Sequence, residues 1–234
     1  MAGLLTVALC LAAGQICCAQ AVTVTGKVML EGAANTSAAS TVVWLMPLGA
    51  AVASSPVAPM HAVLTQKNKM FEPHLLVVTR GSSVDFPNRD PWFHNVFSLF
   101  NGKRFDLGLY EAGTSRTVHF DREGVSFIFC NIHPEMSAVI VVLGSPYFAT
   151  SDKAGSFTIP EVPPGSYMLH VWSENALPAR LQALSREVQV SDAAHNVGTI
   201  HIPVTKVASV PHKNKYGQDY EPPSPNNPVY VQPQ

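Results

Sequence analysis

Short runs of Val, Ile, Thr and Phe alternate along this chain with clusters of Gly, Pro, Asn and Asp. Such runs between turn-forming clusters are typical of β-strands. No long stretch shows a helical period, and at most a helical turn fits Asn175–Ser185. The pattern predicts an all-β fold of β-sandwiches. The predicted strands include Val22–Val28, Thr41–Met46, Leu75–Thr79, Ser82–Phe86, Ser115–Phe120, Val125–Cys130, Ala138–Leu143, Ser156–Ile159, Ser166–Trp172, Arg186–Val190 and Asn196–Pro203.

The first residues have the pattern of a targeting segment. The apolar run Leu4–Ala13 is followed by small and polar residues, which is typical of a secretory signal peptide. The run is too short for the roughly 20 apolar residues that a membrane span needs. We expect residues 1–19 to be a signal peptide, with cleavage after Ala19 or Ala21; lipoprotein processing at Cys17 is the alternative.

The other end of the chain is different in composition. From Pro211 to Gln234 it is rich in Pro, Asn, Gln, Ser and Tyr. Such a segment buries too little apolar surface to offset its ordering entropy. Residues 205–234 are therefore predicted to form a Pro-rich tail that is disordered or loosely draped. Its Pro-Pro-Ser-Pro stretch is an alternative candidate for a polyproline ligand.

Composition and charge narrow the possible partners. Apolar residues make up 47% of the 234 residues, whereas charged residues make up 13% and the formal net charge is −1. A real core can form, but no strong basic field exists to hold nucleic acid or an anionic membrane surface. We expect no nucleic-acid partner and no stable membrane insertion once the signal peptide is cleaved.

The cysteines point to a metal. Of the 4 cysteines, Cys10, Cys17 and Cys18 leave with the signal peptide, so Cys130 is alone in the mature chain. It has no internal disulfide partner, and a lone thiol in an oxidising compartment is a liability unless something occupies it. Metal ligation is one such occupation.

Cys130 opens the run Cys130–Met136, which reads Cys-Asn-Ile-His-Pro-Glu-Met. One thiolate, two imidazoles and one thioether are together the ligand set of a blue-copper electron-transfer site. The run supplies Cys130, His133 and Met136 directly before an apolar strand, and His94 supplies a second imidazole from far upstream. This conjunction predicts one type 1 copper ion. Zinc is the runner-up, although it prefers Cys, His and carboxylate ligands to Met.

Residues 60–143 resemble a cupredoxin of the plastocyanin and amicyanin type, a Greek-key β-sandwich. Met70–Asn88 is similar to the opening strands of that family, His94-Asn95-Val96 to its first-ligand strand, and the loop to the short amicyanin ligand loop. The resemblance implies that the equatorial ligands are His94, Cys130 and His133. It also implies Met136 as the axial ligand and Asn95 as a hydrogen-bonding neighbour that steadies the loop.

The run Phe105–Tyr110 and the start of the loop also resemble cupredoxin-containing proteins labelled methylamine-utilisation proteins. That label does not establish methylamine chemistry for this chain. Glu135 departs from many relatives, and we expect its carboxylate to face solvent and not the copper. For Trp92 we consider two roles: it shields the copper or forms a docking patch, or it packs in the core.

Residues 144–204 resemble a carboxypeptidase regulatory-like domain, a transthyretin-like β-sandwich, with hairpin turns at Asp152–Gly155 and Pro163–Gly165. The opening strands of such a domain are missing after residue 144, but Thr25–Val28 and Thr41–Leu45 fit them. We expect residues 22–58 with 144–204 to form one discontinuous sandwich into which the cupredoxin, residues 59–143, is inserted. Its expected role as scaffold or partner contact is by analogy.

These predictions describe a periplasmic or secreted one-electron carrier with a redox partner protein, and not an enzyme. Two alternatives are a copper-binding or copper-delivery protein and a non-redox binding module of the cell envelope. A multicopper oxidase or nitrite reductase would need a further copper site. The remaining histidines are scattered, and we expect structural or surface roles for them: His61, His74, His119, His170, His195, His201 and His212.

Overall fold

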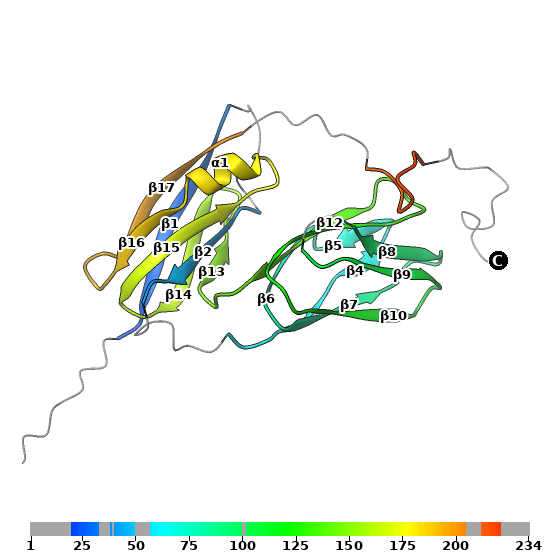
Figure 1. The fold of residues 1–234 in the computed structure, drawn as a ribbon, viewed down its shortest axis with the longest axis horizontal. Coiled ribbons are helices and arrows are strands. Elements are labelled where there is room, and N and C mark those ends of the chain that lie inside the picture. Colours follow the sequence, from blue (N-terminus) through cyan, green and yellow to red (C-terminus); the bar gives the residue numbers. More distant parts are fainter. Residues whose placement is uncertain are drawn as a thin grey trace, which may run out of the picture.

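The computed structural model describes residues 20–32, 38, 40–49, 57–99, 102–204 and 212–220. They form two β-sandwiches that lie side by side (Figure 1), with one short helix, α1 (Pro178–Ala183). The all-β prediction is confirmed, and the helix lies within the predicted Asn175–Ser185 turn. The expected signal peptide lies outside the described residues. In the described part of the chain, no helix is long and apolar enough to cross a membrane.

Strands β3 to β12 form what we call the central sandwich. One sheet has the order β10-β7-β3 and the other has the order β6-β12-β11-β8-β9, while β4 and β5 pair as a separate hairpin. The bounds are β3 (His61–Val63), β4 (Thr65–Lys67), β5 (Met70–Glu72), β6 (Leu75–Thr79), β7 (Ser82–Pro87), β8 (His94–Ser98), β9 (Phe105–Tyr110), β10 (Ser115–Phe120), β11 (Gly124–Phe129) and β12 (Ser137–Leu143).

Period-2 patterning builds the core of the central sandwich. Val84 and Phe86 of β7 are fully buried and alternate with half-buried neighbours. They pack in one cluster with Phe120 of β10, Ile128 of β11 and Ile140 of β12. Burying side chains of this size contributes roughly 1.5–3 kcal/mol each.

The strand β12 is buried on both faces. Ala138, Ile140 and Val142 belong to the central core, whereas Val139 and Val141 belong to a second apolar cluster. That second cluster also contains Leu143 and Val42, with Trp44 and Trp172 packed against it, so it joins the two sandwiches. A continuous apolar run is the expected pattern for a strand covered on both sides.

The remaining strands form what we call the flanking sandwich, because they come from both sides of the central one in the sequence. One sheet has the order β14-β1-β17 and the other β13-β2-β15-β16. Strands from before and after the central sandwich therefore share both sheets. The bounds are β1 (Val22–Glu31), β2 (Val42–Pro47), β13 (Phe148–Thr150), β14 (Ser156–Val162), β15 (Gly165–Trp172), β16 (Arg186–Val190) and β17 (Asn196–Pro203).

The two predicted turns exist, but they do not close hairpins. Asp152 Oδ1 accepts hydrogen bonds from the N–H groups of Ala154 and Ser156, at 2.9 and 2.8 Å. This turn joins β13 to β14, and Pro163 and Pro164 connect β14 to β15, which begins at Gly165; each connection passes from one sheet to the other. The hairpin interpretation was wrong because turn chemistry sets a chain reversal and not the sheet in which the next strand pairs.

One polar contact joins the sandwiches at the surface. His74, between β5 and β6, has Nδ1 3.1 Å from the carbonyl oxygen of Ser137 and Nε2 2.7 Å from a carboxylate oxygen of Glu174. Both ring nitrogens face acceptors, so the doubly protonated ring satisfies both. The hydrogen bond with Glu174 raises the pKa of His74 above its ordinary value, against an opposing effect of burial.

We expect this pair to stabilise the folded chain at mildly acidic pH. Since the folded-state pKa is raised, the contribution is present below the unfolded value of about 6.5 and is lost as pH rises through the folded pKa. Glu174→Gln should lower the urea midpoint at pH 6 and change it little at pH 9. In a His74→Gln background the pH dependence of that loss should vanish; an equal loss at both pH values would contradict the assignment.

Candidate metal centre

Strand pairing brings the upstream histidine to the loop between β11 and β12. His94 is the first residue of β8, which lies next to β11 in the sheet. Phe97 of β8 pairs with Phe129, the last residue of β11. Because the two strands are antiparallel, the start of β8 lies beside the loop that follows β11, Cys130–Met136.

Three side chains converge there. The ligand atoms of His94, Cys130 and His133 all lie within 4.8 Å of one another. Cys130 Sγ is 3.8 Å from His94 Nδ1 and 3.6 Å from His133 Nδ1, and the two Nδ1 atoms are 3.1 Å apart. His133, the most exposed of the three, is 1% exposed. Among the described residues, this is the one such group able to hold a metal ion.

Met136, the fourth predicted ligand, closes the loop. It is buried in the same core cluster as Cys130. The N–H of Cys130 donates to the carbonyl of Met136 at 3.2 Å, and the N–H of Met136 donates to the carbonyl of His133 at 3.1 Å. These bonds pin both ends of the loop, and all four predicted side chains lie at this end of the central sandwich.

The protonation states suit a metal ion. Burial lowers the pKa of His94. The pKa of His133 is lowered to about 4, mainly by burial and to a lesser extent by the nearby charge of His94. Both imidazoles are therefore neutral at pH 7. Burial raises the pKa of the Cys130 thiol, while backbone N–H groups of Asn95, Ile132 and His133 donate to the sulfur and oppose this. A cation in the cluster would complete the stabilisation of the thiolate.

The donor set fits copper better than zinc. Neutral imidazoles, a thiolate and a thioether suit both oxidation states of copper, whereas a zinc site with a fourth protein ligand favours a carboxylate or a second thiolate over a thioether. The carboxylate within the loop, Glu135, is exposed. Its exposure agrees with the expectation that it faces solvent.

A buried carboxylate that sequence reasoning missed lies behind His94. Asp90 is 4% exposed, and its Oδ2 accepts a hydrogen bond from His94 Nε2 at 2.9 Å. Burial would raise the pKa of Asp90, but hydrogen bonds from the backbone of Lys69, from His94 and from the backbone of Asn68 lower it overall. The signal available in the sequence was an Asp four residues before the predicted ligand His94, in a segment without a predicted strand.

Asn95 reaches the ligand loop through its backbone. Its N–H donates to the Cys130 sulfur, whereas its side-chain Nδ2 donates to Asp106 Oδ1 at 2.7 Å. The resemblance implied that Asn95 steadies the loop by hydrogen bonding; the contact with the loop in the structure is the main-chain one, whereas the side chain bonds Asp106. Asp106 lies on the neighbouring strand β9, opposite Phe97, where its carboxylate is the available acceptor.

Residues 212–220 lie against the ligand loop, at the right-hand end of Figure 1. The His212 ring stacks on Phe129 with the centroids 4.1 Å apart. The Tyr220 hydroxyl donates to the Cys130 carbonyl at 2.6 Å, and the Lys215 N–H donates to Asn131 Oδ1 at 2.8 Å. A disordered or loosely draped tail was predicted here; this part of it finds aromatic and polar partners that composition does not reveal. The rest of the predicted tail, residues 205–211 and 221–234, lies outside the described residues.

Most other histidines have the surface or structural roles that were expected. His61, His119, His195 and His201 are exposed. His212 is the exception, because it touches the residue before Cys130. Trp92 is half-buried, and the Lys69 ammonium lies 4.9 Å from its ring centroid, so the ring lies beside the turn between β4 and β5.

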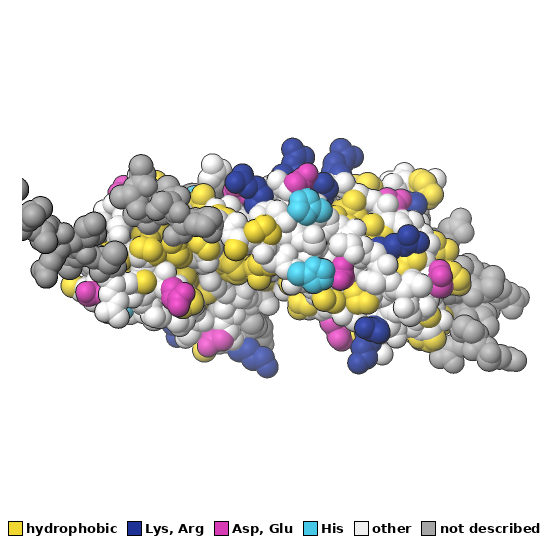
Figure 2. All heavy atoms as spheres, turned by 90° about the horizontal axis from the view of Figure 1, so that it is seen from below, with side chains coloured by type: hydrophobic (Ala, Val, Ile, Leu, Met, Phe, Trp, Pro, Cys, Tyr) yellow, Lys and Arg dark blue, Asp and Glu magenta, His cyan; other side chains and the backbone are white. Residues whose placement is uncertain are grey.

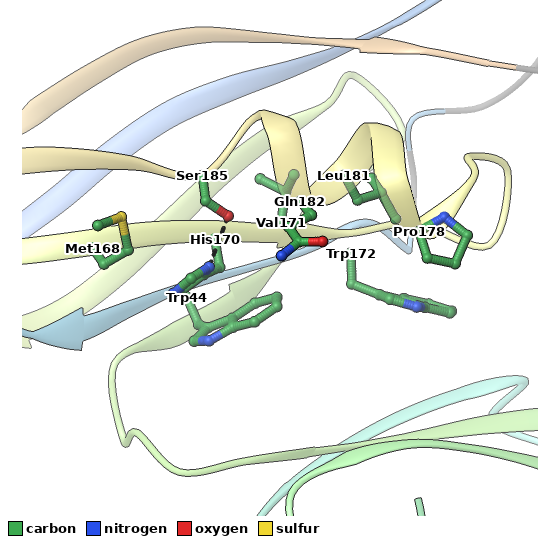
Figure 3. A pocket seen from close by; sticks show the side chains of 9 residues that line it. All are labelled: Trp44, Met168, His170, Val171, Trp172, Pro178, Leu181, Gln182 and Ser185. Carbon is green, nitrogen blue, oxygen red and sulfur yellow. Dashed lines mark hydrogen bonds between the residues drawn. The ribbon is translucent and has the colours of Figure 1, made fainter. Parts of the chain in front are cut away.

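A shallow pocket of about 510 Å³ lies on the flanking sandwich, between α1 and β15. Figure 3 shows the indoles of Trp44 and Trp172 along it, with the Gln182 amide between them. The His170 ring stacks on Trp44 at 5.1 Å, and its Nδ1 is 2.9 Å from the Ser185 hydroxyl. The His170 imidazole and the Ser185 hydroxyl are thus already partnered within the pocket.

Charge on the surface is mixed in sign. Figure 2 shows one face on which acidic, basic and hydrophobic side chains are interspersed. That nucleic acid is not a partner stays a prediction.

Two comparisons concern sequence. The profile of the family described as polysaccharide lyase family 4, domain II, matches residues 142–196, which lie mostly in the flanking sandwich. No curated protein matches the chain. The likeness of this region to a carboxypeptidase regulatory-like domain stays a prediction.

Solved structures similar to part of this chain include a purple cupredoxin from Nitrosopumilus maritimus, with a TM-score of 0.32 and 23% identity over 35% of this chain and 99% of that one. A reduced amicyanin variant has a TM-score of 0.33 and 20% identity over 42% of this chain and 91% of that one. A copper-containing nitrite reductase from Thermus scotoductus SA-01 has a TM-score of 0.35 and 18% identity over 50% of this chain and 28% of that one. At these TM-scores the likeness carries no functional argument, and the function proposed next rests on the geometry of the metal centre.

Proposed function

We propose that this protein is a type 1 copper protein that carries single electrons in the periplasm or outside the cell. The observation that supports this most directly is the buried group of His94, Cys130 and His133, with Met136 closing the same loop. Copper bound there would alternate between Cu(I) and Cu(II), which is one-electron chemistry without a substrate.

The surrounding residues suit that role. His94 is held by a strand, and backbone hydrogen bonds pin the loop that carries Cys130 and His133. Burial excludes water from the ligands, so their surroundings are the same in both oxidation states. Fixed ligands in fixed surroundings keep the reorganisation on electron transfer small.

Burial also favours electron transfer over copper delivery. Delivery needs ligands that an acceptor protein can reach, whereas His94 and Cys130 are fully buried and His133 is 1% exposed. A redox protein needs only to approach closely. The partner would meet residues 212–220, which cover the loop, and Phe93, which is 43% exposed next to His94.

The test is the visible spectrum of the purified protein. After loading with Cu(II), we expect an intense absorption band that disappears when ascorbate is added and returns on reoxidation. A copper-loaded, oxidised protein without that band would contradict the proposal. Tight copper binding with no reversible bleaching would favour the delivery alternative.

A further inference from the structure

A buried anion stands directly behind His94. The Asp90 carboxylate oxygen is 2.9 Å from His94 Nε2, and the side chains of His94 and Asp90 are 0% and 3% exposed. Both oxygens of this carboxylate accept backbone N–H groups, at 2.6 Å from Asn68 and 2.8 Å from Lys69, so Asp90 acts as an acceptor and the hydrogen it shares with His94 sits on Nε2. His94 Nδ1, which faces Cys130 and His133, is then left with its lone pair.

The carboxylate is held by a tight turn from another part of the sandwich. Lys67 pairs with Met70, so Asn68 and Lys69 form the two-residue turn of the β4–β5 hairpin, each with φ of 55°. Their N–H groups donate to the two Asp90 carboxylate oxygens, at 2.6 Å from Asn68 and 2.8 Å from Lys69. Successive N–H groups in such a turn form a nest for an anion.

The backbone conformation of this turn is energetically unfavourable for a residue such as Lys69. Two-residue turns with positive φ at both positions favour Gly or Asn, and Lys69 has the β-carbon that makes this conformation strained. The N–H bonds to Asp90 offset that strain. The anion and the turn therefore stabilise one another.

The segment of Asp90 is held from its own side as well. Its N–H donates to Oδ1 of buried Asn88 at 3.0 Å, and Asn88 Nδ2 donates to the Trp92 carbonyl at 2.7 Å. The N–H of Arg89 donates to the carbonyl of Gln66 in β4 at 2.8 Å. Hydrogen bonds thus fix the carboxylate relative to both the hairpin and His94.

We propose that Asp90, caged by the Asn68–Lys69 turn, positions His94 for metal binding and places a fixed negative charge beside the metal. The second part rests on the proposed function. A buried negative charge favours the more highly charged ion. Asp90 therefore stabilises the oxidised state relative to the reduced one and lowers the reduction potential.

The test compares reduction potentials of the copper-loaded full chain and of Asp90→Asn. Removing the charge should raise the ratio of Cu(I) to Cu(II) affinity at least tenfold, or about 59 mV for a one-electron couple, with the visible band retained. Asp85→Asn is the matched control: Asp85 also bonds an imidazole, His61 Nε2, at 2.9 Å, but this pair is exposed. A shift no larger in Asp90→Asn than in Asp85→Asn would overturn the proposal.

A second measurement needs neither copper nor a variant that folds. Nitrogen-15 NMR of the metal-free protein should show His94 with hydrogen on Nε2 and none on Nδ1. The reverse tautomer would overturn the positioning role. If the protein stayed colourless with copper but showed the expected tautomer, the proposed function would fail and the positioning role of Asp90 would stand.

Discussion

Replacing Cys130 with Ser should abolish the intense visible absorption of the copper-loaded protein. The band of a blue-copper site comes from the thiolate–copper bond, and a serine hydroxyl is a hard donor that stays protonated at neutral pH. Copper affinity should fall on the order of 100-fold or more, since even changes outside the ligand shell cost 10–100-fold. A visible spectrum and a competition titration with a copper chelator measure both effects.

The control for Cys130→Ser separates the site from the fold. Serine is close to cysteine in size, so circular dichroism should be unchanged. His119→Gln removes an exposed histidine on β10 and should keep the full band. A Cys130→Ser protein that kept its band would exclude Cys130 from the metal centre.

Replacing Val141 with Asp should destabilise the folded chain by about 4 kcal/mol. Val141 is 2% exposed and lies in the apolar cluster that joins the two sandwiches. A carboxylate there is buried without a cationic partner, which is among the costliest single changes. Urea unfolding followed by tryptophan fluorescence measures the loss, because Trp44 and Trp172 pack against the same cluster.

The matched control is Val63→Asp. Val63 also lies on a strand of the central sandwich, but it is 45% exposed. The same substitution there should change the free energy of unfolding by no more than about 0.5 kcal/mol. Equal losses at both positions would show that the cluster between the sandwiches is not what makes Val141 sensitive.

Local pattern was enough for the strands and for the loop that carries most of the donors. Period-2 runs such as Ser82–Pro87 alternate between core and surface in the structure as the sequence predicts. The predicted ligands Cys130, His133 and Met136 are close in the chain, so their proximity in the fold is almost guaranteed by covalent geometry. His94 was found because its residue type completes a ligand set and because of a family resemblance.

Contacts between distant segments could not be predicted from local sequence pattern. The run Ala138–Leu143 looks like any buried strand, and the sequence does not say that one face packs in the central core and the other against Val42 and Trp172. The Asp90 carboxylate and the Asn68–Lys69 turn each look like ordinary loop chemistry. Their pairing depends on how the β4–β5 hairpin folds over the segment before β8.

The sequence by itself therefore determined the all-β class, most strand positions and the side chains able to bind a metal. The tertiary structure decided what surrounds them: the caged anion behind His94, the cover formed by residues 212–220 and the apolar junction along β12. The physical reason is that periodicity and ligand type are local properties of the chain. Burial and hydrogen-bond partners are set by which distant segments meet, and a buried charge or a polar tail is stable only where such partners exist.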